Sequence, residues 1–339
     1  MHLSFRWYGP DDPVPLAHIR QIPGMRHIVS ALYDVPVGTA WPEDRLERLR
    51  DEIQSAGLRF SVVESIPVHE DIKLGRAERD RHIDAFCRSL ERVGAIGVDV
   101  VCYNFMPVVD WTRTSTDAPL PDGSTTLAYD HEALADLDPV RDLSSLPGWA
   151  TAYDPAELRA LLAAYDDVGP DALWAHLEYF LERVVPVAET AGVRLAIHPD
   201  DPPWSLFGVP RIVTSGDAFE RITQVVDSPA NGVTLCTGSL GADPEQDLPA
   251  IARRLGDRVH FVHARSVAVT GPKQFHETAH PDGDVDFRAV LGALKETGFD
   301  GPLRPDHGRM IWGETGRPGY GLYDRALGAT YLRGLWDAR

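Results

Sequence analysis

Short apolar runs rich in β-branched residues alternate along the chain with amphipathic stretches of helical period. Eight such runs cover residues 3–7, 27–32, 59–63, 98–104, 194–198, 232–236, 259–263 and 302–306. The stretches between them include residues 42–56, 78–93, 172–191, 247–255 and 287–297, each long enough for a crossover helix. Strands that alternate with helices in this way predict an α/β fold with a parallel sheet.

The number of strands favours a (β/α)8 TIM barrel over an open doubly wound sheet. A doubly wound sheet usually carries a glycine-rich phosphate-binding turn after its first strand, and no such turn follows Trp7. We therefore expect residues 1–339 to form a single TIM-barrel domain.

One interval breaks the alternation after the fourth strand. Residues from about 110 to 170 are rich in Asp, Pro, Ser and Thr, with one short helical pattern at 155–165. Loops of this length are uncommon inside a compact domain, so we expect an inserted loop with a helical excursion. Two interpretations remain open: a lid or dimer arm, or a solvated excursion.

The last four apolar runs all end on residues that can bind a metal ion, namely His198, Cys236, His263 and Asp306. Chemistry in a TIM barrel takes place at the carboxyl ends of the strands. Because strand residues alternate between two faces, Leu195 and Ile197 should point outward and His198 inward. Two imidazoles, a thiolate and a carboxylate form a donor set suited to Zn, Fe or Mn. Each residue alone is more often a packing residue, but the four together predict a metal site.

Other polar residues lie near the same strand ends. Asp200 and Asp201 follow His198, where they would orient a ligand or cap a turn. His307 follows Asp306 and is a candidate general base, with a surface histidine as the alternative. Arg265 shares the inward parity of His263 and is a candidate carboxylate ligand, with a structural salt bridge as the alternative.

A polar segment follows the seventh strand. It contains His276, Glu277, His280, Asp282, Asp284 and Asp286. We expect either a loop that folds over a ligand or a solvated run of charges.

The net charge limits the partners that we expect, and the cysteine content indicates the compartment. The formal net charge of −18 argues against nucleic acid and anionic membranes as partners, and an anionic substrate would need a local attractor. The three cysteines, Cys87, Cys102 and Cys236, have no CxxC spacing, which fits a reducing compartment. No segment has the length and apolarity of a signal peptide or membrane span. We expect a cytoplasmic protein.

Short sequence motifs spread over nearly the whole chain resemble those of the mannonate dehydratase family, within the xylose-isomerase-like barrels. In the first half, the matching segments are residues 5–9 (FRWYG), 21–24 (QIPG), 33–38 (YDVPVG), 64–71 (ESIPVHED), 103–107 (YNFMP) and 110–114 (DWTRT). In the second half they are residues 198–203 (HPDDPP), 236–239 (CTGS), 304–308 (RPDHG) and 317–320 (RPGY). Residues from about 117 to 167 match least well.

The resemblance implies a reaction: loss of water from D-mannonate, a small sugar acid, to give 2-keto-3-deoxy-D-gluconate in hexuronate catabolism. It implies the same four metal ligands, with Mn²⁺ or Fe²⁺ bound, and His307 and Tyr320 as the acid–base pair. It also implies a homo-oligomer, a dimer or larger. The candidate substrate-binding residues are Trp7, Asn104, Arg265, His276 and Arg304.

The chain departs from the expected family pattern at Ser266, where asparagine is expected, and at Ala264, where leucine is more usual. The departure puts a substrate contact from position 266 in doubt but leaves the metal ligands untouched. The alternatives are a sugar isomerase or epimerase, a dehydratase of a different aldonate, and a sugar-acid binding protein without activity.

Overall fold

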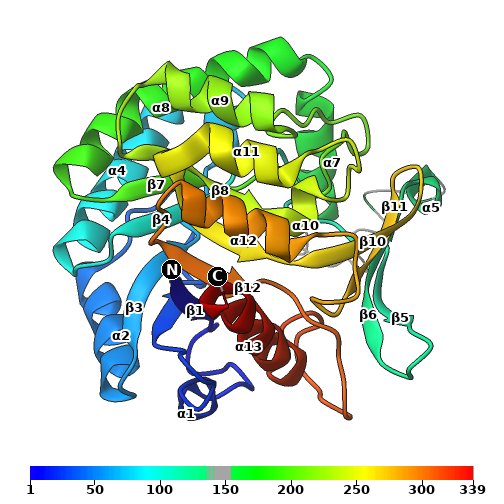
Figure 1. The fold of residues 1–339 in the computed structure, drawn as a ribbon. Coiled ribbons are helices and arrows are strands. Elements are labelled where there is room, and N and C mark those ends of the chain that lie inside the picture. The colour runs from blue at the N-terminus through cyan, green and yellow to red at the C-terminus, as the bar shows by residue number, and fades with distance from the viewer. Residues whose placement is uncertain (136, 138–139, 141–153, 339) are drawn as a thin grey trace.

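Eight parallel strands close into a barrel in the computed structural model, which describes residues 1–338 except 136, 138–139 and 141–153 (Figure 1). The strands are β1 (His2–Arg6), β2 (His27–Ser30), β3 (Arg59–Glu64), β4 (Val100–Tyr103), β7 (Arg194–Ile197), β8 (Asn231–Cys236), β9 (Val259–Ala264) and β12 (Pro302–Pro305). Around the barrel their order is β1-β12-β9-β8-β7-β4-β3-β2. All eight predicted strands, and the predicted TIM barrel, are confirmed.

Helices cover the outside of the barrel (Figure 1). The longer ones are α2 (Glu43–Ser55), α4 (Arg79–Ala95), α7 (Pro155–Ala164), α8 (Pro170–Thr190), α9 (Gly216–Val225), α11 (Leu248–Leu255), α12 (Phe287–Glu296) and α13 (Tyr323–Asp337). The shorter ones are α1 (Leu16–Ile19), α3 (Glu70–Lys73), α5 (His131–Ala135), α10 (Thr237–Leu240) and the 3-10 turn η3 (Gly256–Arg258). The five predicted crossover helices correspond to α2, α4, α8, α11 and α12.

Helix α12 illustrates why these segments are helical. Its buried residues Phe287, Val290, Leu291 and Leu294 follow the i, i+3, i+4, i+7 spacing of one helix face. The Asp286 side chain accepts a hydrogen bond from the Ala289 N–H at 2.9 Å and so satisfies a donor of the first turn. Packing of such apolar faces against the strands fixes the positions of the strand ends.

The strand residues alternate between the helix layer and the barrel interior, as predicted. Leu195, Ile197, Val233 and Leu235 belong to the large apolar cluster under the helices. The barrel interior is filled by Val29, Val62, Val100, Cys102, Ala196 and Phe261. The large cluster includes residues from both ends of the chain, from Leu3 to Leu332. That arrangement agrees with a single domain over residues 1–339, which stays a prediction.

A second, antiparallel sheet of four strands stands beside the barrel (Figure 1). It pairs a hairpin of the insertion, β5 (Ser115–Pro119) and β6 (Thr125–Asp130), with a hairpin after β9, β10 (Ser266–Gly271) and β11 (Gln274–Thr278). The sequence interpretation missed these strands, because they are short and polar and their central pairing joins residues about 145 positions apart.

The insertion is therefore only partly what the sequence suggested. The short helical pattern is confirmed as α7, whose capping box at Asp154 includes the side chain of Glu157. The solvated interpretation is wrong for β6, because its Leu127 and Tyr129 are at most 1% exposed, and a role as a lid or dimer arm stays a prediction. Residues 136, 138–139 and 141–153 of the predicted excursion lie outside the described residues. Among those that are described, no helix has both the length and the apolarity to cross a membrane.

Candidate metal centre and active site

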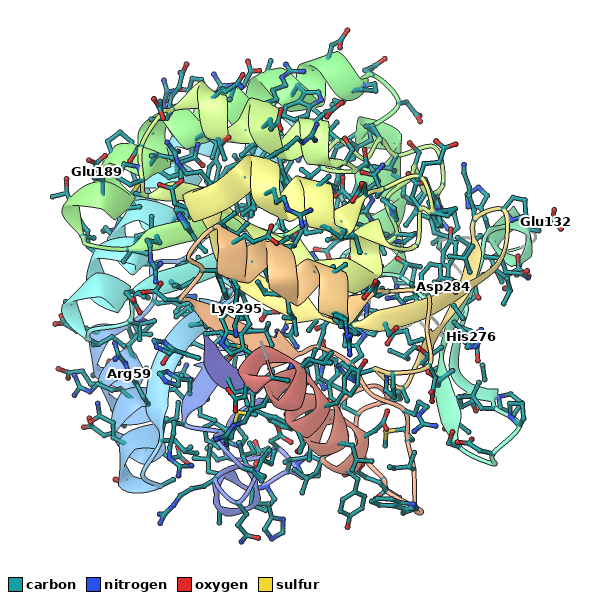
Figure 2. All side chains as sticks on the ribbon, in the orientation of Figure 1. Arg59, Glu132, Glu189, His276, Asp284 and Lys295 are labelled. Carbon is teal, nitrogen blue, oxygen red and sulfur yellow. The ribbon has the colours of Figure 1, made fainter. Side chains whose placement is uncertain are left out.

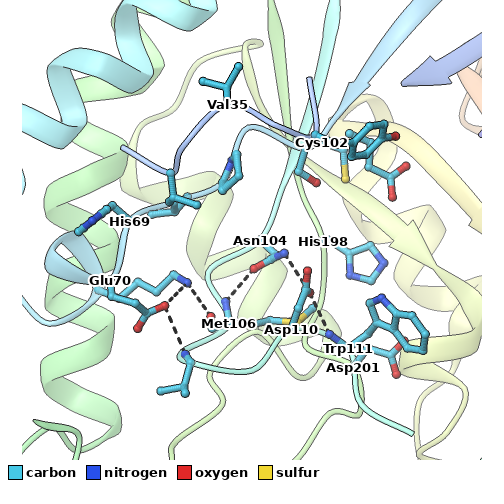
Figure 3. Close-up of a pocket in the computed structure, with 18 of the residues that line it drawn as sticks. Val35, His69, Glu70, Cys102, Asn104, Met106, Asp110, Trp111, His198 and Asp201 are labelled. Atoms are coloured by element: carbon cyan, nitrogen blue, oxygen red, sulfur yellow. Dashed lines mark hydrogen bonds and ion pairs between the residues drawn. The ribbon is translucent and has the colours of Figure 1, made fainter. Parts of the chain in front are cut away.

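A cavity of about 620 Å³ opens at the carboxyl ends of the barrel strands (Figure 3). Strand ends and the residues just after them supply its floor: Arg6, Glu64, Cys102, Asn104, His198, Asp201, Arg304 and Asp306. Part of the wall comes from the insertion, through Asp110 and Trp111, and part from Arg317 and Tyr320 near the C-terminus. The cavity is large enough for a small polar molecule.

The four predicted metal ligands converge on this floor. The donor atoms of His198, Cys236 and His263 lie within 4.8 Å of one another. Nε2 of His198 is 3.1 Å from Nδ1 of His263, and the Asp306 carboxylate lies 3.8 Å from Nδ1 of His263 and 3.9 Å from Sγ of Cys236. Donors bound tetrahedrally at about 2.1 Å are separated by roughly 3.4 Å, and sulfur ligands lie farther out. The residues therefore fit a divalent metal ion.

The surroundings orient these donor atoms. Nδ1 of His198 lies 2.6 Å from the Pro199 carbonyl oxygen, so this nitrogen carries the proton and Nε2 keeps its lone pair. Nε2 of His263 lies 3.3 Å from the Glu64 carboxylate, which leaves the lone pair of Nδ1 available to bind a metal ion. The Ser239 hydroxyl donates a hydrogen bond to Sγ of Cys236 at 3.1 Å and so fixes the position of the sulfur.

Buried arginines and carboxylates form two groups around the predicted metal ligands, and in each group the positive and negative charges are equal in number. In the first, Arg6 and Arg304 pair with Glu64, and Arg304 also reaches Asp306 at 2.6 Å. Burial alone would raise the pKa values of Glu64 and Asp306, but Arg304 and its neighbours hold both well below their usual range. Both carboxylates are therefore ionised at neutral pH.

The second group links the insertion to the barrel. Arg113 is fully buried, forms a bidentate pair with Asp201 at 2.9 and 3.0 Å, and also donates to Glu277 at 2.7 Å. Arg265 donates to Asp201 at 2.7 Å and to Ser239 at 3.1 Å. Two arginines thus face two carboxylates in this group as well.

The predicted acid–base pair lies next to the predicted metal ligands. Nε2 of His307 is 2.9 Å from the Tyr320 hydroxyl, and Nδ1 is 2.9 Å from both carboxylate oxygens of Glu277. Burial raises the pKa of Tyr320 by more than Arg6 and Arg304 lower it, so the pKa lies above its usual value. The phenol therefore keeps its proton at neutral pH and can serve as a donor. Such a pair beside a metal centre suits removal of one proton and delivery of another.

The sequence matches a known family model over its full length. The D-mannonate dehydratase (UxuA) model covers residues 1–339. The chain belongs to the mannonate dehydratase family. A mannonate dehydratase of Streptococcus uberis is 55% identical over 342 residues, which cover 100% of this chain and 98% of the relative. Mannonate dehydratase 2 of Halalkalibacterium halodurans is 52% identical, over 100% of this chain and 99% of the relative.

Solved structures agree with this membership of the mannonate dehydratase family. The crystal structure of mannonate dehydratase from Streptococcus suis serotype 2 matches with a TM-score of 0.93 and 49% identity, covering 100% of this chain and 94% of that one. D-psicose 3-epimerase from Clostridium cellulolyticum H10 matches with a TM-score of 0.56 at 12% identity, covering 100% and 96%. The second likeness shows the barrel fold alone.

Three of the five predicted substrate-binding residues line the cavity: Asn104, Arg265 and Arg304. Trp7 and His276 are not among the described residues that line it. The Trp7 side chain packs in the apolar layer under the helices, because Arg6 has the inward position on β1. His276 alternates with Glu277 along β11 and so faces away from the Glu277 side of the sheet. Figure 2 labels His276 at the second sheet.

Asp200 and Asp201, for which two roles were left open, have different roles in the structure. Asp201 belongs to the buried ion-pair group, whereas Asp200 accepts hydrogen bonds from the Ile212 and Val213 N–H groups at 2.8 Å and holds a loop. In the strand-7 segment, Glu277 and His280 are buried, whereas Asp282, Asp284 and Asp286 are exposed. The solvated interpretation therefore holds for the three aspartates, and a loop that folds over a ligand stays a prediction.

Sequence reasoning missed several residues of the site. Arg6, Glu64 and Arg113 lie within the matching motifs but are not among the predicted site residues, although the parity of β1 and β3 points Arg6 and Glu64 inward. Asp110 lines the cavity beside His198 and Trp111, held by Asn104, whose Nδ2 donates to Asp110 Oδ1 at 3.1 Å (Figure 3). Nothing in the linear sequence indicated that contact.

Proposed function

We propose that this protein catalyses the metal-dependent dehydration of D-mannonate to 2-keto-3-deoxy-D-gluconate and water, a step of hexuronate catabolism. The observation that carries the proposal is the His307–Tyr320 pair, 2.9 Å apart, in the cavity that is also lined by His198 and Asp306, two of the four proposed ligands. Membership of the mannonate dehydratase family supports the choice of substrate.

We propose Mn²⁺ or Fe²⁺ as the cofactor, held by His198, Cys236, His263 and Asp306. The mixed nitrogen, sulfur and oxygen set suits either ion. When bound, the ion supplies positive charge that stabilises the negative charge developing beside the substrate carboxylate as the C2 proton leaves. The two arginines at the floor, Arg6 and Arg304, are each paired with carboxylates, so they add little net charge for an anionic substrate.

The acid–base steps follow from the chemistry of the pair. Nε2 of His307 takes the C2 proton, and the Tyr320 hydroxyl gives its proton to the departing C3 hydroxyl, which leaves as water. The enol that remains becomes the 2-keto acid. Because 2.9 Å separates Nε2 from the phenol oxygen, the proton held by His307 can then pass to the phenolate and restore both groups.

The test is direct incubation of the metal-loaded protein with D-mannonate. We expect formation of the 2-keto-3-deoxy acid with Mn²⁺ or Fe²⁺. A panel of other aldonates and of neutral aldoses and ketoses distinguishes this activity from another dehydratase, an isomerase or an epimerase. Absence of product from D-mannonate with both ions would overturn the proposal.

We further propose a cytoplasmic homo-oligomer, a dimer or larger. The three cysteines are free thiols, and one of them is a proposed metal ligand that a disulfide would remove, which favours a reducing compartment. Light scattering of the purified protein would test the assembly.

A further inference from the structure

The histidine of the acid–base pair has two rival neighbours on its Nδ1 side. Glu277 presents both carboxylate oxygens to Nδ1 at 2.9 Å, while Arg265 presents NH1 to the same nitrogen at 3.2 Å. A carboxylate requires a proton on Nδ1, whereas a guanidinium donates to an Nδ1 that has none. The two neighbours therefore favour opposite tautomers of the neutral ring.

We propose that Glu277 is the positioning residue that holds His307 in the Nδ1–H tautomer, so that Nε2 keeps a lone pair for Tyr320 and the substrate. The two carboxylate contacts are shorter than the arginine contact, and a carboxylate acceptor strengthens each. In the opposite tautomer Nε2 would carry a proton and could not act as a base. This inference rests on the proposed function for its kinetic consequence, but not for the tautomer itself.

The position of Glu277 depends on the second sheet. Its strand, β11, pairs with β6 of the insertion through Gln274, Phe275 and His276. Arg113, which precedes that hairpin, donates Nε and NH2 to Glu277 Oε1 at 3.0 and 2.7 Å. Burial alone would raise the pKa of Glu277, yet His307, Arg265 and Arg113 keep it below its usual value, so the carboxylate stays ionised.

The rival neighbour, Arg265, has other acceptors that hold it in place. Its NH2 donates to Asp201 at 2.7 Å and to Ser239 at 3.1 Å, and its NH1 lies 3.3 Å from the Asp306 carboxylate. Arg265 is thus held mainly by Asp201, while Glu277 remains directed at His307. The insertion and the strand-7 hairpin contribute no proposed metal ligand. They therefore act on the reaction by fixing which ring nitrogen of His307 carries the proton.

The direct test is ¹⁵N NMR of histidine-labelled full-length protein loaded with Zn²⁺ as a diamagnetic probe. The His307 signals are assigned by their loss in His307→Asn. We expect the Nδ1–H tautomer in the parent protein and a shift toward Nε2–H in Glu277→Gln, where Arg265 becomes the stronger neighbour. A parent protein with the Nε2–H tautomer, or a Gln variant with an unchanged tautomer, would overturn the proposal whether or not D-mannonate is the substrate.

Kinetics provide the second readout. We expect Glu277→Gln to lower kcat by roughly 10²- to 10⁴-fold with little change in KM, since general acid–base catalysis contributes about that much. Glu277→Asp, which keeps the charge, should recover part of the activity. The matched control is Gln274→Ala, which removes the 2.9 Å bond from Gln274 Nε2 to Asp130 between the same two strands without touching His307. An equal loss of kcat in the control would assign the effect to the sheet as a whole and overturn the specific role of Glu277.

Discussion

Nε2 of His198 and Nδ1 of His263 lie 3.1 Å apart, and the other nitrogen of each ring faces an oxygen. If each of those other nitrogens carries its proton, two lone pairs point at one another, which is unfavourable unless a cation lies between them. We therefore expect Cys236→Ser and Asp306→Asn to reduce the bound metal measured by elemental analysis. Chelation should abolish turnover, and Mn²⁺ or Fe²⁺ should restore it. Full metal content in both variants would contradict the proposed ligand set.

The acid–base pair can be separated from metal binding. His307→Asn and Tyr320→Phe should each lower kcat by at least about 10²-fold, because each removes one proton transfer. Metal content should be unchanged, since neither residue is a proposed ligand. Steady-state kinetics with elemental analysis on the same samples checks both points. Near-normal turnover in either variant would remove that residue from the mechanism.

The buried Arg113 should matter for stability as well as for positioning. Arg113→Met leaves Asp201 and Glu277 buried with only part of their partners, a change that typically costs about 3–5 kcal/mol. Guanidinium unfolding measures the loss. The control is Arg48→Ala, which breaks the exposed pair with Asp44 and should cost less than about 1 kcal/mol. Equal effects of the two changes would argue against a structural role for the insertion.

One glycine holds open the space for Arg265. A Cβ at Gly238 would lie 2.0 Å from Nε and 2.8 Å from Cγ of Arg265, so Gly238→Ala should displace that arginine and weaken its bond to Asp201. We expect lower stability and lower kcat. Gly169→Ala is the control, because a Cβ there meets nothing within 4 Å. Similar behaviour of both variants in thermal unfolding would contradict the crowding argument.

Stability should fall as the pH falls, in part because of His260. This side chain is 1% exposed, its Nδ1 donates to the Leu195 carbonyl at 2.7 Å, and burial lowers its pKa to about 4. The unfolded chain, with a histidine pKa near 6.5, takes up a proton before the folded protein does. The contribution of the neutral, buried His260 to the free energy of unfolding is therefore full above about pH 6.5. It is lost toward pH 4, by roughly 3 kcal/mol at most. Urea unfolding from pH 7.5 to 4.5 should show a shallower pH dependence for His260→Gln than for the parent. Parallel curves would contradict the assignment.

The sequence was most informative where chemistry and strand periodicity coincide. His198 and Cys236 could be placed inward because the alternation of apolar residues before them fixes their parity. The second sheet could not be predicted, because β6 and β11 gain their pairing from residues far apart in sequence and carry little apolar signal of their own. Arg113 and Glu277 show the same limit: a buried ion pair between two loops leaves no periodic pattern in either. Tyr320 was found only through family resemblance, since a tyrosine after Pro-Gly is otherwise an ordinary turn residue.

The shared sheet has a consequence for engineering. Because one loop supplies Arg113 and the other supplies Glu277, and the strands of the two loops pair with each other, neither loop is an independent module. A graft that transfers the insertion of a relative without its strand-7 hairpin would pair strands whose edges do not match. It would also leave a buried charge without its partner. Chimeras of barrel enzymes built on this scaffold should therefore exchange both loops together.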